Sequence, residues 1–312
     1  MEELKKNISL SVDLNKEHEE ITFKEFSDMY IEHERLYKEY NTITGYEVAI
    51  IAFEGLHELE IAKIKNIDIQ RCVDALIKSR KANSTTKLYL SRIYSIFNSA
   101  VNMSKIMLEN PVKNVIVPKY KPTNEKRALT KLELKTLLGS LKNRKYYVIS
   151  LIASKCGLRL GEILGLRWLD IDEKSCSIIV NKQWKRLSTG KYGIGSVKSK
   201  NSNRIVPISI KVLAELIKYK NEIPSYMDKR IFKNKSSESI SNALKNIYKK
   251  AGFDISIHEL RHTCATNLIS NGMDFKMAAE ILGHDVQETY KTYAHVNSDI
   301  RQRAAELINL ID

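Results

Sequence analysis

Helical periodicity is the feature that most constrains how this chain of 312 residues can fold. Apolar side chains recur at spacings of three and four residues, which places them on one face of a helix. The stretch from about 84 to 107 is typical, with Tyr89, Ile93, Ile96, Phe97, Ala100 and Val101 on one face. The same spacing predicts helices near 43–56, 145–156, 160–167, 211–220, 238–251, 258–270 and 274–282. The chain is therefore predicted to be mainly α-helical.

Helix start signals support this prediction at three places. Thr22 with Glu25, and Thr130 with Glu133, have the spacing of a capping box, in which each side chain bonds the other's backbone N–H. Asp68 is predicted to cap a further helix, because aspartate accepts hydrogen bonds from the first free N–H groups.

The period changes to that of strands between residues 176 and 209. The run CSIIV at 176–180 predicts a strand, and GSVKSKNSNRIVPIS at 195–209 predicts a hairpin that turns near Asn201 and Ser202. Helical signals return from 211. The fold class is therefore mainly α with a small antiparallel β-sheet.

A basic, proline-containing segment divides the chain. Residues 118–127, PKYKPTNEKR, hold two of the five prolines and four basic residues, a composition typical of an extended connector. We therefore expect a flexible tail at 1–20, a helical domain at 21–117, a basic linker at 118–127 and a second domain at 128–312.

Net charge indicates the kind of partner. The formal charge of +14 favours a polyanion, and nucleic acid is the commonest large one. Between 181 and 204 there are seven basic residues and no acidic one, which indicates an edge that contacts phosphates, although a solvated face is the alternative. The predicted DNA-contacting residues are Lys182, Lys185, Arg186, Lys200 and Arg204, with Lys119 and Lys121 from the linker.

Several classes of protein are disfavoured. The four cysteines have no CxxC spacing, which argues against a cysteine zinc site and a disulfide framework. The first residues lack the apolar run of a signal peptide, and the longest apolar stretch, 146–166, is interrupted by charged residues. We expect a cytoplasmic protein, associated with the nucleoid when bound to DNA, with no cofactor and no membrane partner.

The segment HELRH matches a zinc-peptidase signature. His258 and His262 lie four residues apart on one helix face, as two zinc ligands would. A third ligand is missing from any companion motif, since Glu280 and Glu288 are only isolated acids. Arg261 would also place a positive charge beside the metal. No metal site is therefore expected, and the zinc peptidase stays a minor alternative.

The same residues suit metal-free cleavage of a phosphodiester. Such cleavage needs a nucleophile, cations for the phosphoryl oxygens and a proton for the leaving group. Arginine suits the second task, because its planar fork pairs with two oxygens and keeps its charge. Arg159 follows Gly157 at a predicted helix start, and Arg261 lies three residues after His258.

Four segments resemble the tyrosine recombinase (phage-type integrase) family, which includes the Xer recombinases. They are GLRLGEILGLRWLDID at 157–172, VKSKNSNRIVPIS at 197–209, HELRHTCATNLISNG at 258–272 and LGHDVQETYKTYAHV at 282–296. They occur in the family's order. The resemblance covers roughly 20–312 and implies a helical, SAM-like core-DNA-binding domain followed by a catalytic domain. It also implies a site-specific recombinase that cuts and rejoins duplex DNA through a 3′-phosphotyrosyl intermediate, without metal or ATP.

The resemblance further implies roles around the scissile phosphate. Arg159 and Arg261 would clamp it, and Glu162 would support them from behind. His258 would assist proton transfer and hold the phosphate, while His284 would hydrogen-bond the phosphoryl group or pack beneath the nucleophile.

The nucleophile and the general acid also follow from the resemblance. Tyr293 is preferred as the nucleophile, with Tyr290 as its competitor three residues earlier. Lys198 would protonate the departing 5′ oxygen, and Lys200 is the fallback. Two further histidines, His262 and His295, are interpreted as structural.

Partners and biological role follow less directly. Duplex DNA is the expected partner, and the apolar stripe of the C-terminal segment is expected to dock on a neighbouring protomer in a homo-tetramer; it consists of Ala304, Leu307, Ile308 and Ile311. An excision or directionality factor and a host DNA-bending protein are further candidate partners. Integration and excision of a phage or mobile element is preferred over Xer-like resolution, and a non-catalytic DNA-binding protein is the alternative from another class.

Overall fold

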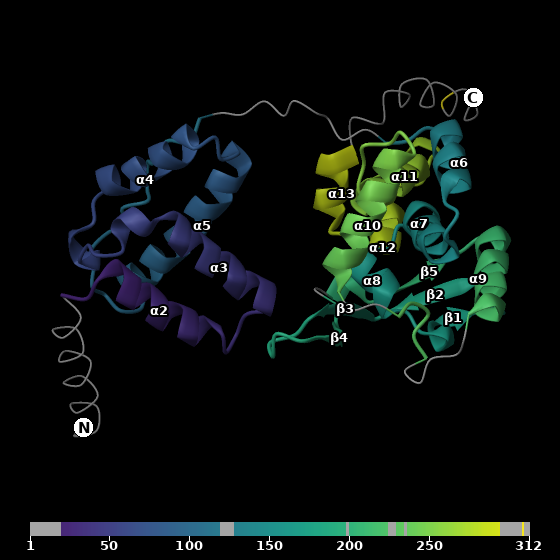
Figure 1. Ribbon diagram of the computed structural model, residues 1–312, viewed down its shortest axis with the longest axis horizontal. Helices are drawn as coiled ribbons and strands as arrows, with labels where there is room; N and C mark the ends of the chain where they lie inside the picture. The colour runs from purple at the N-terminus through teal and green to yellow at the C-terminus, as the bar shows by residue number, and fades with distance from the viewer. Residues whose placement is uncertain are drawn as a thin grey trace. The chain divides into compact units, whose positions relative to one another are not determined.

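The computed structural model describes residues 20–118, 128–197, 200–223, 229–233, 236–293 and 308. Backbone contacts separate the chain near residue 123 into two compact units, each shown as a ribbon in Figure 1. Each unit has its own apolar core. The predicted tail and the predicted linker lie outside the described residues, except for Glu20 and Pro118.

The N-terminal unit is helical. Its elements are α2 (Phe23–Glu34), α3 (Tyr40–Ala52), α4 (Asn66–Lys78) and α5 (Asn83–Asn102), with short 3-10 turns at Glu54–Leu56 and Ile61–Lys63. The capping box at Thr22 is present as predicted, since Thr22 N donates to Glu25 at 3.0 Å and Glu25 N donates to the Thr22 hydroxyl at 3.2 Å. Phe23 and Phe97 stack in the core with ring centroids 5.4 Å apart.

Two helix ends in this unit differ from the prediction. Asp68 is not the cap residue of α4 but lies in its first turn, where its carboxylate accepts a hydrogen bond from Lys65 N at 3.0 Å. The helix α5 ends at Asn102, before the predicted end near residue 107. Lys105 adopts a left-handed φ of 53°, and Ile106 N returns to Ala100 O at 2.9 Å, which closes the helix end.

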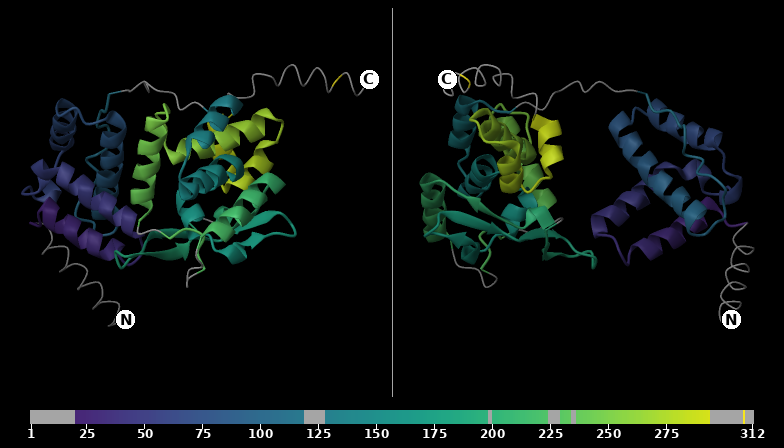
Figure 2. Two further views of the ribbon diagram at one scale, coloured as in Figure 1. Left: turned by 45° about the vertical axis from the view of Figure 1, so that its right-hand side comes forward. Right: turned by 180° about the vertical axis from the view of Figure 1, so that it is seen from behind.

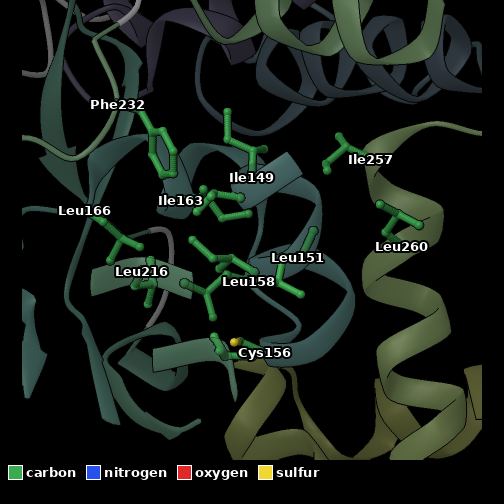
Figure 3. Packing of buried hydrophobic residues seen from close by; sticks show 14 of the residues in the cluster. Ile149, Leu151, Cys156, Leu158, Ile163, Leu166, Leu216, Phe232, Ile257 and Leu260 are labelled. Carbon is green, nitrogen blue, oxygen red and sulfur yellow. The ribbon is translucent and has the colours of Figure 1, made fainter. Parts of the chain in front are cut away.

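The C-terminal unit packs helices against small sheets. Its helices are α6 (Lys131–Ser140), α7 (Arg144–Cys156), α8 (Leu160–Gly165), α9 (Ile210–Glu222), α10 (Ser237–Lys250), α11 (Ile257–Ser270), α12 (Phe275–Leu282) and α13 (Val286–Tyr293), with a 3-10 turn at Trp168–Asp170. Figure 3 shows side chains of α7, α8, α9 and α11 in this core. In both views of Figure 2 the strands lie on the lower side of the unit and α12 and α13 on the upper side. Within the described part of the chain, no helix combines the length and apolar character needed to cross a membrane.

The sheets confirm the predicted class but correct the predicted pairing. One sheet has the order β1 (Ile171–Asp172), β2 (Ser177–Val180), β5 (Arg204–Pro207), all antiparallel. The other is a hairpin of β3 (Lys182–Arg186) and β4 (Tyr192–Ser196). The predicted hairpin at 195–209 is therefore wrong, because β4 and β5 pair with different strands. The sequence KQWKR of β3 has no apolar alternation, so periodicity could not reveal this strand.

Candidate active site

A left-handed glycine positions Arg159. Helix α7 ends at Cys156, and Gly157 follows with a φ of 68°, a conformation that costs other residues energy. The chain then turns so that Arg159 is the N-cap residue of α8. The Arg159 side chain is 37% exposed, donates to Glu162 Oε1 at 2.9 Å and donates to Gly283 O at 3.0 Å. Its guanidinium is thus held from one side and open to solvent on the other.

Glu162 is a buried carboxylate surrounded by arginines. Its side chain is 2% exposed and accepts hydrogen bonds from both terminal nitrogens of Arg204, at 3.1 and 2.9 Å, and from Arg159. Arg261 Nη1 lies 3.9 Å from Glu162 Oε2. Burial alone raises the pKa of this carboxyl, but the bonds and charge of Arg204, with those of Arg159, outweigh it and hold the pKa below its usual value.

Arg204 lies within this cluster and not on a DNA-facing surface. Its side chain is only 5% exposed, and it also donates to Ile281 O at 2.7 Å and Ser202 O at 3.0 Å. The prediction that Arg204 contacts DNA phosphates is therefore wrong. The β5 pleat alternates buried and exposed positions, and Arg204 occupies a buried one.

The other predicted DNA-contacting residues differ in how exposed their side chains are. Lys182 binds Asp170 at 2.5 Å, and its side chain is only 17% exposed, so a buried carboxylate compensates its charge. Lys185 is half-buried and Arg186 is exposed on β3. The remaining predicted side chains lie outside the described part of the molecule; they are Lys119, Lys121, Lys198 and Lys200.

Arg261 projects from α11 into the interior beside this cluster. Its side chain is 2% exposed and donates to Gly157 O and to Leu282 O, both at 2.6 Å. Burial and the charges of Arg159 and Arg204 lower the pKa of Arg261 to about 9, so it stays a cation at neutral pH. Its Nε is buried and has no hydrogen-bond partner among the described residues.

His284 completes the cluster as a neutral imidazole. It follows Gly283, whose φ of 65° ends α12, and its Nε2 lies 2.7 Å from Arg261 Nη2. A guanidinium only donates, so Nε2 accepts and the ring proton is on Nδ1. Burial, with the charges of Arg261 and Arg159, lowers the pKa of His284 to about 3. The buried Nδ1–H has no acceptor among the described residues.

The two candidate tyrosines of α13 have different environments. Tyr293 is 3% exposed and packs against Ala265 and Leu282. Burial raises the pKa of Tyr293 to about 12, although the charge of Arg261 lowers it in part. Tyr290 is 58% exposed, and its ring meets Phe275 edge-on with 5.2 Å between centroids. Of the two tyrosines, Tyr293 is thus the one whose pKa is affected by the charge of Arg261.

The two histidines of HELRH take separate directions. His262 Nδ1 lies 3.1 Å from the hydroxyl of Tyr293, and the two rings stack with centroids 5.0 Å apart. His258 is exposed, and its charge contributes to the lowered pKa of His284. The sequence predicted a structural role for His262 and did not reveal this contact. The spacing of four residues between His258 and His262 was misleading, because it suggested that both histidines face the same site. Among the residues with described positions, no cluster of three metal-binding side chains occurs.

Comparison with known proteins identifies the family of the chain. Residues 127–299 match the model of the phage integrase family. The chain belongs to this family. It is a site-specific tyrosine recombinase, as its motifs predicted.

Individual relatives cover most of the chain. A tyrosine recombinase XerC-like protein of Caldanaerobacter subterraneus subsp. tengcongensis is 30% identical over 286 residues, which span 81% of this chain and 73% of that protein. The ICEBs1 integrase of Bacillus subtilis is 28% identical over 273 residues, or 80% and 72% of the two chains. The Tn1549 transposon integrase, solved in complex with transposon right end DNA, has a similar fold, with a TM-score of 0.79, 22% identity and coverage of 94% of this chain and 100% of that chain.

Proposed function

We propose that this recombinase integrates and excises a phage or mobile element by cutting and rejoining duplex DNA through a 3′-phosphotyrosyl intermediate. The formal charge of +14 supports DNA as the substrate. The similarity to the ICEBs1 integrase supports a mobile element, and the fold is shared with an integrase solved on transposon DNA. The proposed site of action is the cytoplasm, on nucleoid DNA.

The observation that carries the proposal is a set of donors without an acceptor. Arg261 Nε and His284 Nδ1 are buried and unpartnered among the described residues, and Arg159 is partly open beside them. Buried donors are normally satisfied, so an unpartnered pair indicates a missing acceptor. The three arginines around Glu162 exceed its single charge by two, which suits the negative charge of a phosphodiester.

These contacts support the following roles in the proposed reaction. Arg159 and Arg261 hold the non-bridging oxygens, and His284 donates from Nδ1 to one of them. Glu162 keeps Arg159 in place, and the pairing of Glu162 with Arg204 leaves the charges of the other two arginines available. Charge stabilisation of this kind is commonly the largest single contribution to such catalysis.

The covalent step conserves the energy of the phosphodiester bond. Tyr293 attacks the phosphorus, and the departing 5′ oxygen takes a proton from Lys198, with Lys200 as the fallback donor. His258 assists proton transfer at the exposed side of α11. A 5′-hydroxyl of the partner strand later attacks the phosphotyrosyl ester, so no ATP is required.

Assembly of a homo-tetramer is the further part of the proposal. A cavity of about 560 Å³ opens between the end of α7, the end of α11 and the start of α12. Leu268, Met273 and Met277 line it together with polar side chains. We infer that this cavity receives the apolar stripe of a neighbouring protomer's C-terminal segment. An excision or directionality factor and a host DNA-bending protein are proposed as accessory partners.

The decisive experiment is a covalent-adduct assay. The full-length chain is mixed with nicked duplexes from the ends of its own element, and the products are separated on a denaturing gel. We expect a DNA-linked protein band with wild type and with Tyr290→Phe, and none with Tyr293→Phe. Loss of the band only in Tyr290→Phe would move the nucleophile to that residue. Tight binding without a band on any duplex would favour the non-catalytic DNA-binding alternative.

Resolution of repeated sites is the second candidate function. It is favoured by the 30% identity with the XerC-like recombinase. A plasmid assay separates the two: an integrase joins two different sites on separate molecules, whereas a resolvase deletes the DNA between two identical direct repeats. Deletion without joining would contradict the mobile-element role and leave the chemistry intact.

A further inference from the structure

His262 has no part in the reaction steps assigned above, yet it contacts the proposed nucleophile. Its Nδ1 is 3.1 Å from the Tyr293 hydroxyl, which is hydrogen-bonding distance. The two rings also stack, with 5.0 Å between centroids and 26° between planes. The hydrogen bond and the stack are separate constraints, and together they hold the phenol ring of Tyr293 against His262.

The position of His262 on α11 links this contact to the phosphate-binding cluster. It directly follows Arg261, whose Nη1 donates to Gly157 O and whose Nη2 donates to Leu282 O and contacts His284 Nε2. Tyr293 packs against Leu282 in the same cluster of buried residues. The helix therefore presents an imidazole nitrogen to the phenol and a cation to the proposed phosphate from adjacent positions.

A phenol that attacks phosphorus must lose its proton, and burial makes the phenolate costly. A general base must lie within hydrogen-bond reach of the proton that it removes. Among the described residues, His262 is the hydrogen-bond partner of the Tyr293 hydroxyl. His258, the other histidine of the motif, is on an exposed part of the helix.

We propose that His262 is a catalytic residue whose Nδ1 accepts the phenolic proton of Tyr293 as the phosphotyrosyl bond forms. The inference rests on the proposed function. In cleavage, the bond from Tyr293 Oη to phosphorus forms and the bond from phosphorus to the 5′ oxygen breaks. The phenolic proton moves to His262, and the 5′ oxygen takes a proton from Lys198. In rejoining, a 5′-hydroxyl attacks the phosphorus and gives its proton back to Lys198, and His262 returns its proton to the departing Tyr293.

Three substitutions distinguish a role of His262 as general base from a role as hydrogen-bond partner or as stacking ring. His262→Asn keeps a hydrogen-bonding atom near the place of Nδ1 but is no base, and His262→Phe keeps the ring without the nitrogen. His262→Ala removes both. We expect all three to form the adduct at least about 100-fold more slowly in a single turnover, the usual scale of general-base catalysis. They should bind the duplex in a gel-shift assay as wild type does.

Chemical rescue adds a readout that a structural role would not affect. Free imidazole should accelerate His262→Ala, where the space of the ring is empty, and not His262→Phe, where it is filled. A duplex with sulfur in place of the bridging 5′ oxygen locates the defect, because a thiolate leaves without a proton. That substrate should restore Lys198→Ala and leave His262→Asn slow. His33→Asn, an exposed histidine of α2, is the control for loss of an imidazole elsewhere.

The inference and the proposed function fail in different ways. If wild type forms no adduct on any duplex, both fall. If wild type forms the adduct and His262→Asn matches its rate, only the inference is wrong. Faster cleavage by the three variants would mean that His262 restrains the phenol, which also overturns it. So would rescue of His262→Asn by the sulfur substrate, or failure of imidazole to accelerate His262→Ala.

Discussion

At the scale of single residues, Glu162 organises the site although it cannot touch DNA directly. Its buried carboxylate binds the Arg204 side chain through both oxygens, and it accepts from the Arg159 side chain with one oxygen and from Arg159 N with the other. A buried ion pair contributes little beyond its desolvation cost, but loss of one partner leaves an uncompensated charge. In this cluster the uncompensated charge would lie beside the two arginines that are proposed to hold the phosphate.

Arg204→Met should therefore destabilise the C-terminal unit. We expect the free energy of unfolding in urea to fall by about 3–5 kcal/mol, because Glu162 stays buried without its main partner. The double variant Arg204→Met, Glu162→Gln should recover part of the loss. Arg186→Met, an exposed basic position on β3, is the matched control and should change stability by about 0.5 kcal/mol or less. Equal effects at both positions would contradict the structural role of Arg204.

His284 should make stability depend on pH. Its pKa is lowered to about 3 in the folded chain, whereas the unfolded chain takes up the proton near the ordinary value of 6.5. The unfolded state thus binds more protons between these values, so stability is lost as the pH falls from about 6.5 towards 3. The nitrogen NMR shifts of His284 should report a neutral ring protonated on Nδ1 at pH 5. A protonated ring at that pH would contradict the assignment.

At the scale of elements, the turn between α7 and α8 positions two arginines of the proposed active site, Arg159 and Arg261. Gly157 permits the left-handed turn, and its carbonyl accepts the Arg261 hydrogen bond at 2.6 Å. A Cβ atom at this position would lie 2.7 Å from Leu282 Cδ2, on the helix whose end carries His284. Three elements therefore meet at a position where the backbone conformation and the close approach of Leu282 both favour glycine.

Gly157→Ala should lower both stability and adduct formation. The left-handed backbone costs about 1–2 kcal/mol for a residue with a side chain, and displacement of Leu282 adds to this. Gly139→Ala is the control, because an added Cβ in α6 meets no atom within 4 Å. Alanine inside a helix should stabilise the chain by about 0.5–1 kcal/mol. Thermal unfolding and the adduct assay measure both effects, and a neutral Gly157→Ala would contradict this account.

At the scale of the whole molecule, the proposed exchange of C-terminal segments should couple protomers. Deletion of residues 299–312 should leave adduct formation at a single site and abolish joining between paired sites, because the acceptor cavity is then empty. Met273→Asp in that cavity should have the same effect by opposing apolar docking. Native electrophoresis on paired sites would show dimers in place of tetramers. Normal joining by both variants would contradict the assembly model.

Local patterns in the sequence determined the helices, two capping boxes and the family motifs. These features depend on residues a few positions apart, such as Thr22 with Glu25. The motifs also identified Arg159, Arg261, His284 and Tyr293 as candidate residues. In the structure Arg261 contacts His284, and Arg159 donates to Glu162 and to Gly283 O.

Only the tertiary structure decided which way the basic and polar side chains point. A run of lysines and arginines does not encode direction, so Arg204 could not be distinguished from Arg186 until β5 was seen to pair with β2 and bury it. The contact between His262 and Tyr293 joins residues 31 positions apart in the chain. It depends on how α13 packs against α11, and helical spacing carries no information about that packing.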